Sequence, residues 1–191
     1  MTMGDEGMSE PNHEVLWNAA FSWDDYLAHE IREHKDLWQA VWARSVVPAW
    51  ATEEASALPD RKLMVISEDW CGDASNSVPV IARFAANAPS VQIRVVKRDE
   101  NPELMDLYLT NGARSIPLVV VLDEEFRPIG RWGPRPTELQ NLVLREKAAA
   151  LRPMEDIYRE VRRWYARDRG ESILRELLGV METGARPDNE V

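Results

Sequence analysis

The sequence contains a single cysteine, Cys71, among its 191 residues. One thiol cannot form a disulfide within the chain, and it cannot supply a zinc site made of cysteines. Histidine is almost as scarce, with His13, His29 and His34 all near the N-terminus. Any thiol chemistry must therefore recruit a second thiol from another molecule.

Long apolar runs are also missing. The longest segment without Asp, Glu, Lys or Arg covers ten residues, Phe84 to Ile93, which is short of the roughly 18 to 20 that a membrane-spanning helix needs. Residues 1–12 carry three acidic residues and neither a basic residue nor an apolar core, unlike a secretory signal. We therefore expect a cytoplasmic protein with no membrane partner.

The chain has few basic residues: it contains 23 Lys and Arg and 33 Asp and Glu, which gives a net charge of −10. Binding to nucleic acid requires a cationic surface, so nucleic acid is excluded as the main partner. The arginines between positions 159 and 169 are interleaved with Glu160 and Asp168, which is typical of a solvated helix face. At 45% hydrophobic residues, the chain can build the core of one domain with extensions.

The N-terminal third has the period of helices. Apolar or aromatic residues recur there at steps of three and four, and five of the eight tryptophans lie there, at positions 17, 23, 38, 42 and 50. Tryptophans at helical spacing indicate packing rather than a ligand box. We expect residues 1–12 to be disordered and residues 13–57 to form a helical extension packed on the core.

From residue 61 the pattern changes to alternating strands and helices. The predicted order is β-α-β-α-β-β-α, a mixed four-stranded sheet covered by helices, in a domain of residues 58–150. Its strands are expected at residues 63–66, 91–96, 118–122 and 127–132. One further helix is expected within residues 151–179, followed by a disordered tail over residues 180–191.

The motif that carries chemistry lies where the first strand passes into the first helix, and it reads Trp70-Cys71-Gly72-Asp73-Ala74. With it, residues 58–147 resemble the thioredoxin family, whose active site reads Trp-Cys-Gly-Pro-Cys. Further elements of the resemblance follow in the family's order. They are Pro79 in the following helix, Asp99-Glu100-Asn101-Pro102 after the next strand, the Ile116-Pro117 loop, and Gly133 after the last strand.

This resemblance implies an α/β protein with the thioredoxin-like fold and helical extensions at both ends. It implies that Cys71 is the nucleophile, flanked by Trp70, Gly72 and Asp73, and that Ile116 and a cis Pro117 bind substrate. Ala74 replaces the resolving cysteine, and Val65 replaces the buried acid that helps to deprotonate that cysteine. The chain is therefore similar to a monothiol or degenerate member, which cannot run a dithiol cycle by itself.

The reactivity of Cys71 is balanced between opposing effects. A helix N-terminus favours the thiolate by roughly 0.3 to 1 kcal/mol, while the nearby carboxylates of Glu68, Asp69 and Asp73 each oppose it by a comparable amount. We expect these effects to cancel at a partly exposed thiol. Arg114, three residues before Pro117, is either a solvated loop charge, which is favoured, or a group that approaches Cys71.

Two main function classes remain, and a third is less favoured. The first is a monothiol thiol-disulfide oxidoreductase in which Cys71 attacks a disulfide-bearing protein or small thiol, and glutathione, bacillithiol or another protein resolves the adduct. The second is a non-catalytic protein that binds extended peptides at the Ile116-Pro117 loop. The third is a peroxide sensor that oxidises Cys71.

Two other kinds of chemistry, cysteine hydrolysis and metal binding, lack residues that they need. A cysteine hydrolase needs a base beside its thiol, and the histidines lie in the N-terminal extension. The pairs His29 with Glu33 and Glu30 with His34 have the spacing of a metal site on one helix face, but two ligands without a third favour a polar face. We expect no metal and no cofactor beyond an external thiol.

Overall fold

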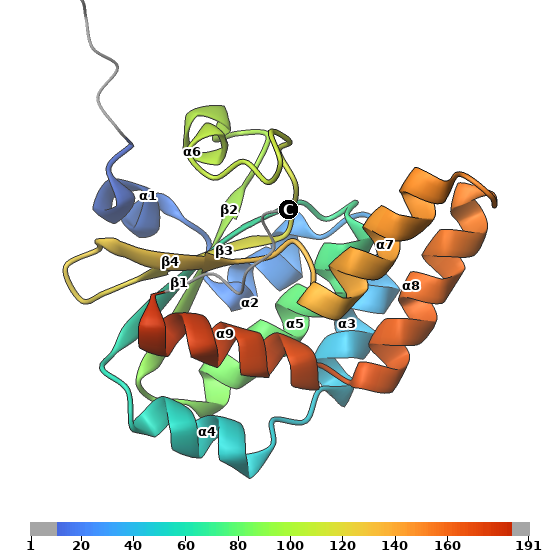
Figure 1. Ribbon diagram of the computed structural model, residues 1–191. Coiled ribbons are helices and arrows are strands. Elements are labelled where there is room, and N and C mark those ends of the chain that lie inside the picture. The colour runs from blue at the N-terminus through green and yellow to red at the C-terminus, as the bar shows by residue number, and fades with distance from the viewer. Residues whose placement is uncertain (1–10, 185–191) are drawn as a thin grey trace, which may run out of the picture.

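The computed structural model describes residues 11–184 and is built around one mixed sheet (Figure 1). Its strands lie in the order β2-β1-β3-β4. β1 pairs with β2 in parallel and with β3 in antiparallel orientation, and β4 pairs antiparallel with β3. The strands are β1 (Arg61–Ser67), β2 (Val91–Lys97), β3 (Leu118–Leu122) and β4 (Pro128–Trp132).

Between residues 61 and 149 the order is β1, α5 (Gly72–Asn87), β2, α6 (Pro102–Asp106), β3, β4 and α7 (Thr137–Ala149), which confirms the expected thioredoxin-like fold. Further helices of the described residues precede β1 and follow α7. They are α1 (His13–Ala19), α2 (Trp23–Asp25), the π-helix η1 (Tyr26–Glu30), α3 (Lys35–Arg44), α4 (Ala49–Ser56), α8 (Met154–Asp168) and α9 (Glu171–Thr183). None of the described helices is long and apolar enough to cross a membrane.

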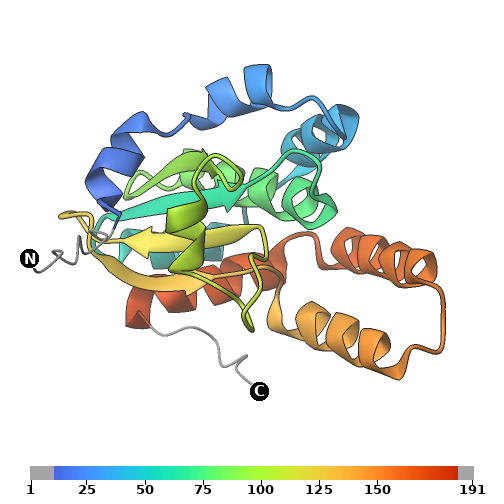
Figure 2. The ribbon, with the colours of Figure 1, turned by 90° about the horizontal axis from the view of Figure 1, so that it is seen from above.

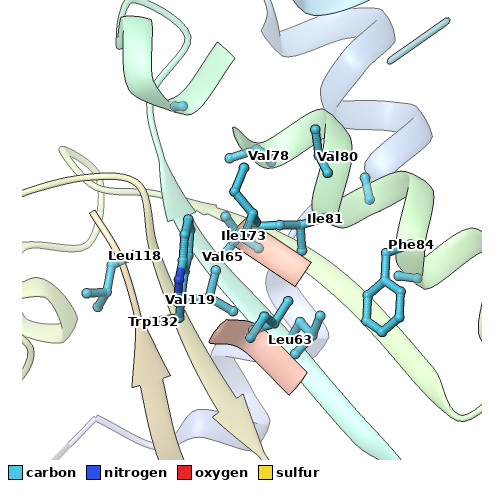
Figure 3. Packing of buried hydrophobic residues seen from close by; sticks show 14 of the residues in the cluster. Leu63, Val65, Val78, Val80, Ile81, Phe84, Leu118, Val119, Trp132 and Ile173 are labelled. Carbon is cyan, nitrogen blue, oxygen red and sulfur yellow. The ribbon is translucent and has the colours of Figure 1, made fainter. Parts of the chain in front are cut away.

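The core lies between the sheet and helices α5 and α9. β1 and β3 are nearly continuous runs of apolar residues, and all five residues of β3 are buried. Such runs are typical of strands covered on both faces. Val78, Ile81 and Phe84 of α5 face these strands, with Ile173 of α9 beside them (Figure 3).

The N-terminal extension packs on the other elements as part of the same core. Trp17, Trp23 and Trp38 are at most 6% exposed and belong to one cluster with the sheet residues. Phe21 exchanges two backbone hydrogen bonds with Val95 at the outer edge of β2. Residues 1–10 of the expected disordered segment lie outside the described residues, whereas Asn12 is placed and caps α1.

The expected single C-terminal helix is wrong, because two helices occupy that region. Arg169 and Gly170 both take left-handed backbone angles, with φ of 55° and 86°, and separate α8 from α9. A Cβ atom at Gly170 would lie 2.5 Å from Val80 of α5, so the chain turns where it touches the core. Helical spacing continues across the break, which is why the sequence pattern did not reveal it.

The C-terminal boundaries also shift. Helix α9 continues through Gly179 to Thr183, so the expected tail begins too early, and its residues 185–191 lie outside the described residues. α9 packs against β4 and α5. It therefore covers the sheet, although it lies outside the domain of residues 58–150 that the sequence predicted. Helices α7 and α8 instead form a hairpin that projects to one side (Figure 2).

Candidate active site around Cys71

Cys71 lies between the end of β1 and the start of α5, where it is the N-cap residue of the helix. Its backbone has φ −80° and ψ 116°, and its carbonyl accepts the first helical hydrogen bond from Ser75. The thiol Sγ donates to the carbonyl oxygen of Ile116 at 3.5 Å. The structure thus places the cysteine against the Ile116–Pro117 loop.

That loop is held by a second loop after β4. The peptide bonds Ile116–Pro117 and Gly133–Pro134 are both cis, and only the first was expected from the resemblance to the thioredoxin family. Gly133 has φ +118°, and a Cβ atom there would lie 2.3 Å from the carbonyl oxygen of Pro117. Only glycine can allow the two loops to approach this closely.

The Cys71 thiol is buried, with 9% of the residue exposed, so the expectation of a partly exposed cysteine is wrong. Burial raises the pKa of Cys71 and the charge of Asp73 adds to this, although the backbone amides of Ala74 and Asp73 and the charge of Arg135 act in the opposite direction. The opposing effects do not cancel, because desolvation by the surrounding core is the largest of them.

Two of the three carboxylates expected beside the thiol are occupied elsewhere. The side chain of Glu68 accepts a hydrogen bond from the backbone amide of Asp99 at 2.8 Å. The Asp69 carboxylate accepts two from the amides of Arg32 and Glu33, both at 2.9 Å. Burial works against the charged form of Asp69, but these amides lower its pKa below the ordinary value.

Asp73 is the centre of a buried polar network. Its Oδ2 accepts from Arg135 Nη2 at 2.5 Å and its Oδ1 accepts from the Tyr165 hydroxyl at 3.1 Å. Arg135 also donates to Gln140 Oε1 at 2.8 Å, and Ser77 Oγ donates to the Tyr165 hydroxyl at 3.3 Å. The network joins the first turns of α5 to the loop before α7 and to α8.

The Trp70 side chain is 40% exposed beside the thiol. The guanidinium carbon of Arg98 lies 4.8 Å from the centre of its ring, and Arg98 Nη1 donates to the backbone carbonyl of Arg114 at 3.3 Å. Arg98 therefore connects the cysteine motif to the segment that leads into Pro117.

Of the two interpretations of Arg114, the structure agrees with the favoured one, a solvated charge, and not with an approach to Cys71. Its guanidinium group forms two hydrogen bonds of 2.7 Å with the carboxylate of Asp106, and both side chains are half-exposed. The arginine whose charge acts on the thiol is Arg135. Arg114 is a surface charge whose partner, Asp106, is the last residue of α6.

The positions that distinguish this chain from a dithiol protein are buried. Ala74 and Val65 both have 0% exposure, so the place of a second cysteine holds a methyl group and that of the buried acid holds an isopropyl group. Apart from its chain neighbours and the nearby backbone of its own helix, no described atom lies within 4 Å of where a Cβ at Gly72 would be. No other group takes the place of the resolving thiol, since the chain has one cysteine.

The helix face expected to join Glu30 with His34 does not form. The π-helix η1 ends at Glu30, and Ile31 has the extended backbone angles −83° and 110°. Glu30 pairs with Lys97 instead. Among residues 11–184, no group of three or more His, Cys, Asp or Glu side chains is arranged to hold a metal ion.

Arg98, Arg135 and Tyr165 were missed by sequence reasoning. Arg135 directly follows Gly133-Pro134 and Arg98 directly precedes Asp99-Glu100-Asn101-Pro102, so both border segments that had been recognised. Tyr165 had no such signal, because it lies 92 residues from Asp73 and reaches it through the packing of α8.

A profile of the family described as Thioredoxin matches residues 20–152. The match covers more than half of the chain and includes the cysteine motif and both proline loops. The chain belongs to the thioredoxin family.

Comparison with solved structures shows the fold alone. A crystal structure of a protein of unknown function from Pseudomonas aeruginosa is similar with a TM-score of 0.71 and 19% identity, covering 92% of this chain and 99% of that one. An HIV epitope-scaffold protein is similar with a TM-score of 0.69, 19% identity and the same coverage. A search of curated proteins finds no match.

Proposed function

We propose that this thioredoxin-fold protein is a monothiol thiol-disulfide oxidoreductase that uses Cys71. The observation that carries the proposal is the position of Cys71 Sγ, at the N-terminus of α5 and 3.5 Å from the Ile116 carbonyl beside Pro117. The amides of Asp73 and Ala74 act on the sulfur in the direction that favours a thiolate. A disulfide entering beside the exposed Trp70 ring would reach Cys71 Sγ between the N-terminus of α5 and the Ile116–Pro117 loop.

The proposed exchange has two steps. The Cys71 thiolate attacks one sulfur of a disulfide, so that a mixed disulfide forms and the other sulfur leaves as a thiolate. An external thiolate, such as that of glutathione or bacillithiol, then attacks the substrate sulfur of the mixed disulfide and releases Cys71. After these steps one substrate sulfur has left as a thiolate and the other is joined to the external thiol in a new disulfide. A second external thiolate reduces that disulfide, so two external thiols are oxidised for each substrate disulfide that is reduced. A cytoplasmic protein would meet the reduced thiol pool that this cycle requires.

The test uses the full chain and glutathione disulfide. Incubation is expected to add one glutathione per chain by mass spectrometry, and the adduct is expected to persist until a reduced thiol is added. Cys71→Ser is expected to form no adduct. Ser75→Ala, which keeps the thiol and removes a hydroxyl bonded to Gly72 O at 2.9 Å, is a matched control and is expected to form it. An absence of adduct on the unchanged protein at pH 7 to 9 would contradict the proposal.

The burial of Cys71 favours a second candidate, a peptide-binding protein in which the thiol is incidental. A thiol that is 9% exposed with a raised pKa is less available than that of a free peptide. An extended peptide could still pair with the backbone of the Ile116–Pro117 loop beside Trp70. Alkylation of Cys71 no faster than that of a denatured chain, together with no glutathione adduct, would support this candidate.

A further inference from the structure

The carboxylate of Asp73, two residues after Cys71, has both oxygens occupied by side chains from outside α5. We propose that Arg135 is a positioning residue that controls how readily Cys71 gives up its proton, and that Tyr165 of α8 acts through the same carboxylate. This inference rests on the thiol-disulfide exchange proposed above. It makes the α7–α8 hairpin a part of the thiol site.

The Asp73–Arg135 ion pair is shielded from water. The two side chains are 12% and 14% exposed, and their atoms meet at 2.5 Å. Arg135 is further fixed through Gln140, which is 8% exposed. Its Nε is buried and has no acceptor among the described residues. Because solvent screens this pair little, its charges act on the nearby sulfur more strongly than surface charges would.

The charges facing Cys71 have opposite signs. Asp73 disfavours the thiolate and Arg135 favours it. Two tyrosines also face this region, Tyr165 from α8 and Tyr26 from η1, and burial raises the pKa of each, so both are neutral at physiological pH. Burial remains the largest effect on the pKa of Cys71, and among the charged side chains one carboxylate and one guanidinium group act on it in opposite directions.

The hydroxyl of Tyr165 changes this balance without carrying charge. It donates to Asp73 Oδ1 and accepts from Ser77 Oγ, and the residue is 6% exposed. A donated hydrogen bond spreads the negative charge of the carboxylate away from the thiol. Loss of the hydroxyl would leave that charge concentrated on Asp73, in the direction that opposes ionisation of Cys71.

A purely structural network would behave differently. If the network only holds the hairpin to α5, removal of either ionic partner would loosen the site and change the reactivity of Cys71 in the same direction. If the network controls ionisation, removal of Arg135 slows thiolate chemistry and removal of Asp73 accelerates it. The opposite signs are the readout that separates the two explanations.

The experiment measures the rate of alkylation of Cys71 by iodoacetamide against pH in the full chain. Arg135→Gln is expected to slow the reaction at pH 7 by about tenfold, the lower end of the usual effect of a nearby opposite charge. Asp73→Asn is expected to accelerate it, and Tyr165→Phe to slow it less than Arg135→Gln. Arg135→Lys and the double variant Asp73→Asn/Arg135→Gln are expected to react close to the unchanged protein.

Arg127→Gln is the matched control, because Arg127 follows β3 at the end of the sheet opposite Cys71 and pairs with Asp123 on the surface. It is expected to change nothing. Equal rates in all variants, or shifts of the same sign for Arg135→Gln and Asp73→Asn, would overturn the inference. If the rates shift as expected but glutathione disulfide never forms an adduct, the proposed function fails while the control of ionisation stands. If Arg135→Gln does not fold, the opposite signs expected for Tyr165→Phe and Asp73→Asn still decide it.

Discussion

Trp38 donates its indole Nε1–H to the backbone carbonyl of Asp69 at a distance of 3.1 Å. The donor lies in the N-terminal extension and the acceptor lies two residues before Cys71. The side chain of Asp69 in turn accepts the backbone amides of Arg32 and Glu33. The extension therefore holds the segment that enters the cysteine motif, in addition to covering the core.

Trp38→Phe tests this contact. The indole has 0% exposure, and the change removes its hydrogen bond and leaves a partly buried carbonyl without that donor. We expect a loss of about 1 to 3 kcal/mol in the free energy of unfolding, measured by urea denaturation. Trp50→Phe is the control, since that ring is partly exposed and contacts Arg175; an equal loss in both variants would contradict a specific role for Trp38.

Deletion of residues 1–57 is expected to destabilise the remaining chain. The deletion removes Trp17, Trp23 and Trp38 from the common cluster and exposes the apolar surface that they cover. It also removes the bridge between Phe21 and Val95. The measurement is the melting temperature by circular dichroism, which should fall strongly. An unchanged melting temperature would mean that the extension is a separate module.

Gly133→Ala and Gly179→Ala form a matched pair of substitutions. A methyl group at Gly133 would meet the Pro117 carbonyl at 2.3 Å on a backbone with φ +118°. Gly179 lies within α9, where a methyl group would meet no described atom within 4 Å apart from its chain neighbours and the nearby backbone of its own helix. We expect Gly133→Ala to destabilise the protein by more than about 2 kcal/mol. Gly179→Ala should stabilise it by up to about 1 kcal/mol. Equal effects in thermal denaturation would count against the close approach of the two loops.

Ala74→Cys restores a second cysteine at the family's spacing. Ala74 lies in the first turn of α5, three residues after the N-cap Cys71, so we expect mild oxidation to join the two sulfurs within the chain. Mass spectrometry should show the loss of two hydrogens and thiol titration should find no free thiol. The companion variant Cys71→Ser/Ala74→Cys should keep one thiol. Rapid turnover is not expected, because Val65 leaves the second cysteine without a buried acid.

Asp69→Asn tests a pH dependence. The pKa of Asp69 is lowered in the folded chain from its ordinary value of 3.8, so the unfolded state binds more protons between the two values. The contribution of Asp69 to stability is present above pH about 4 and is lost as the pH falls through the folded pKa. The variant should be less stable than the unchanged protein at pH 7, and the difference should narrow below pH about 4. Asp24→Asn controls for the removal of an exposed carboxylate. If the stability difference between Asp69→Asn and the unchanged protein did not depend on pH, a lowered pKa of Asp69 would be contradicted.

The succession of elements was readable from the sequence because it depends on local signals. The apolar run Leu118–Leu122 predicted a buried strand, and the helical spacing of the N-terminal tryptophans predicted that they pack on the core. The change in the spacing of apolar residues at residue 61 predicted where the N-terminal helices end and the sheet domain begins. The motif at Cys71, with its resemblance to the thioredoxin family, indicated where the site would lie.

The properties of the site depended on contacts between distant residues. Whether Cys71 is exposed, which arginine acts on it and what Asp73 binds are decided by the packing of the Ile116–Pro117 loop, the segment after Gly133 and helix α8. Helix α9, which looks in sequence like a continuation of α8, returns to cover β4 only because Arg169 and Gly170 turn the chain against Val80. Local propensity specifies the elements, but the burial and charge that govern a thiol arise only when those elements are packed together.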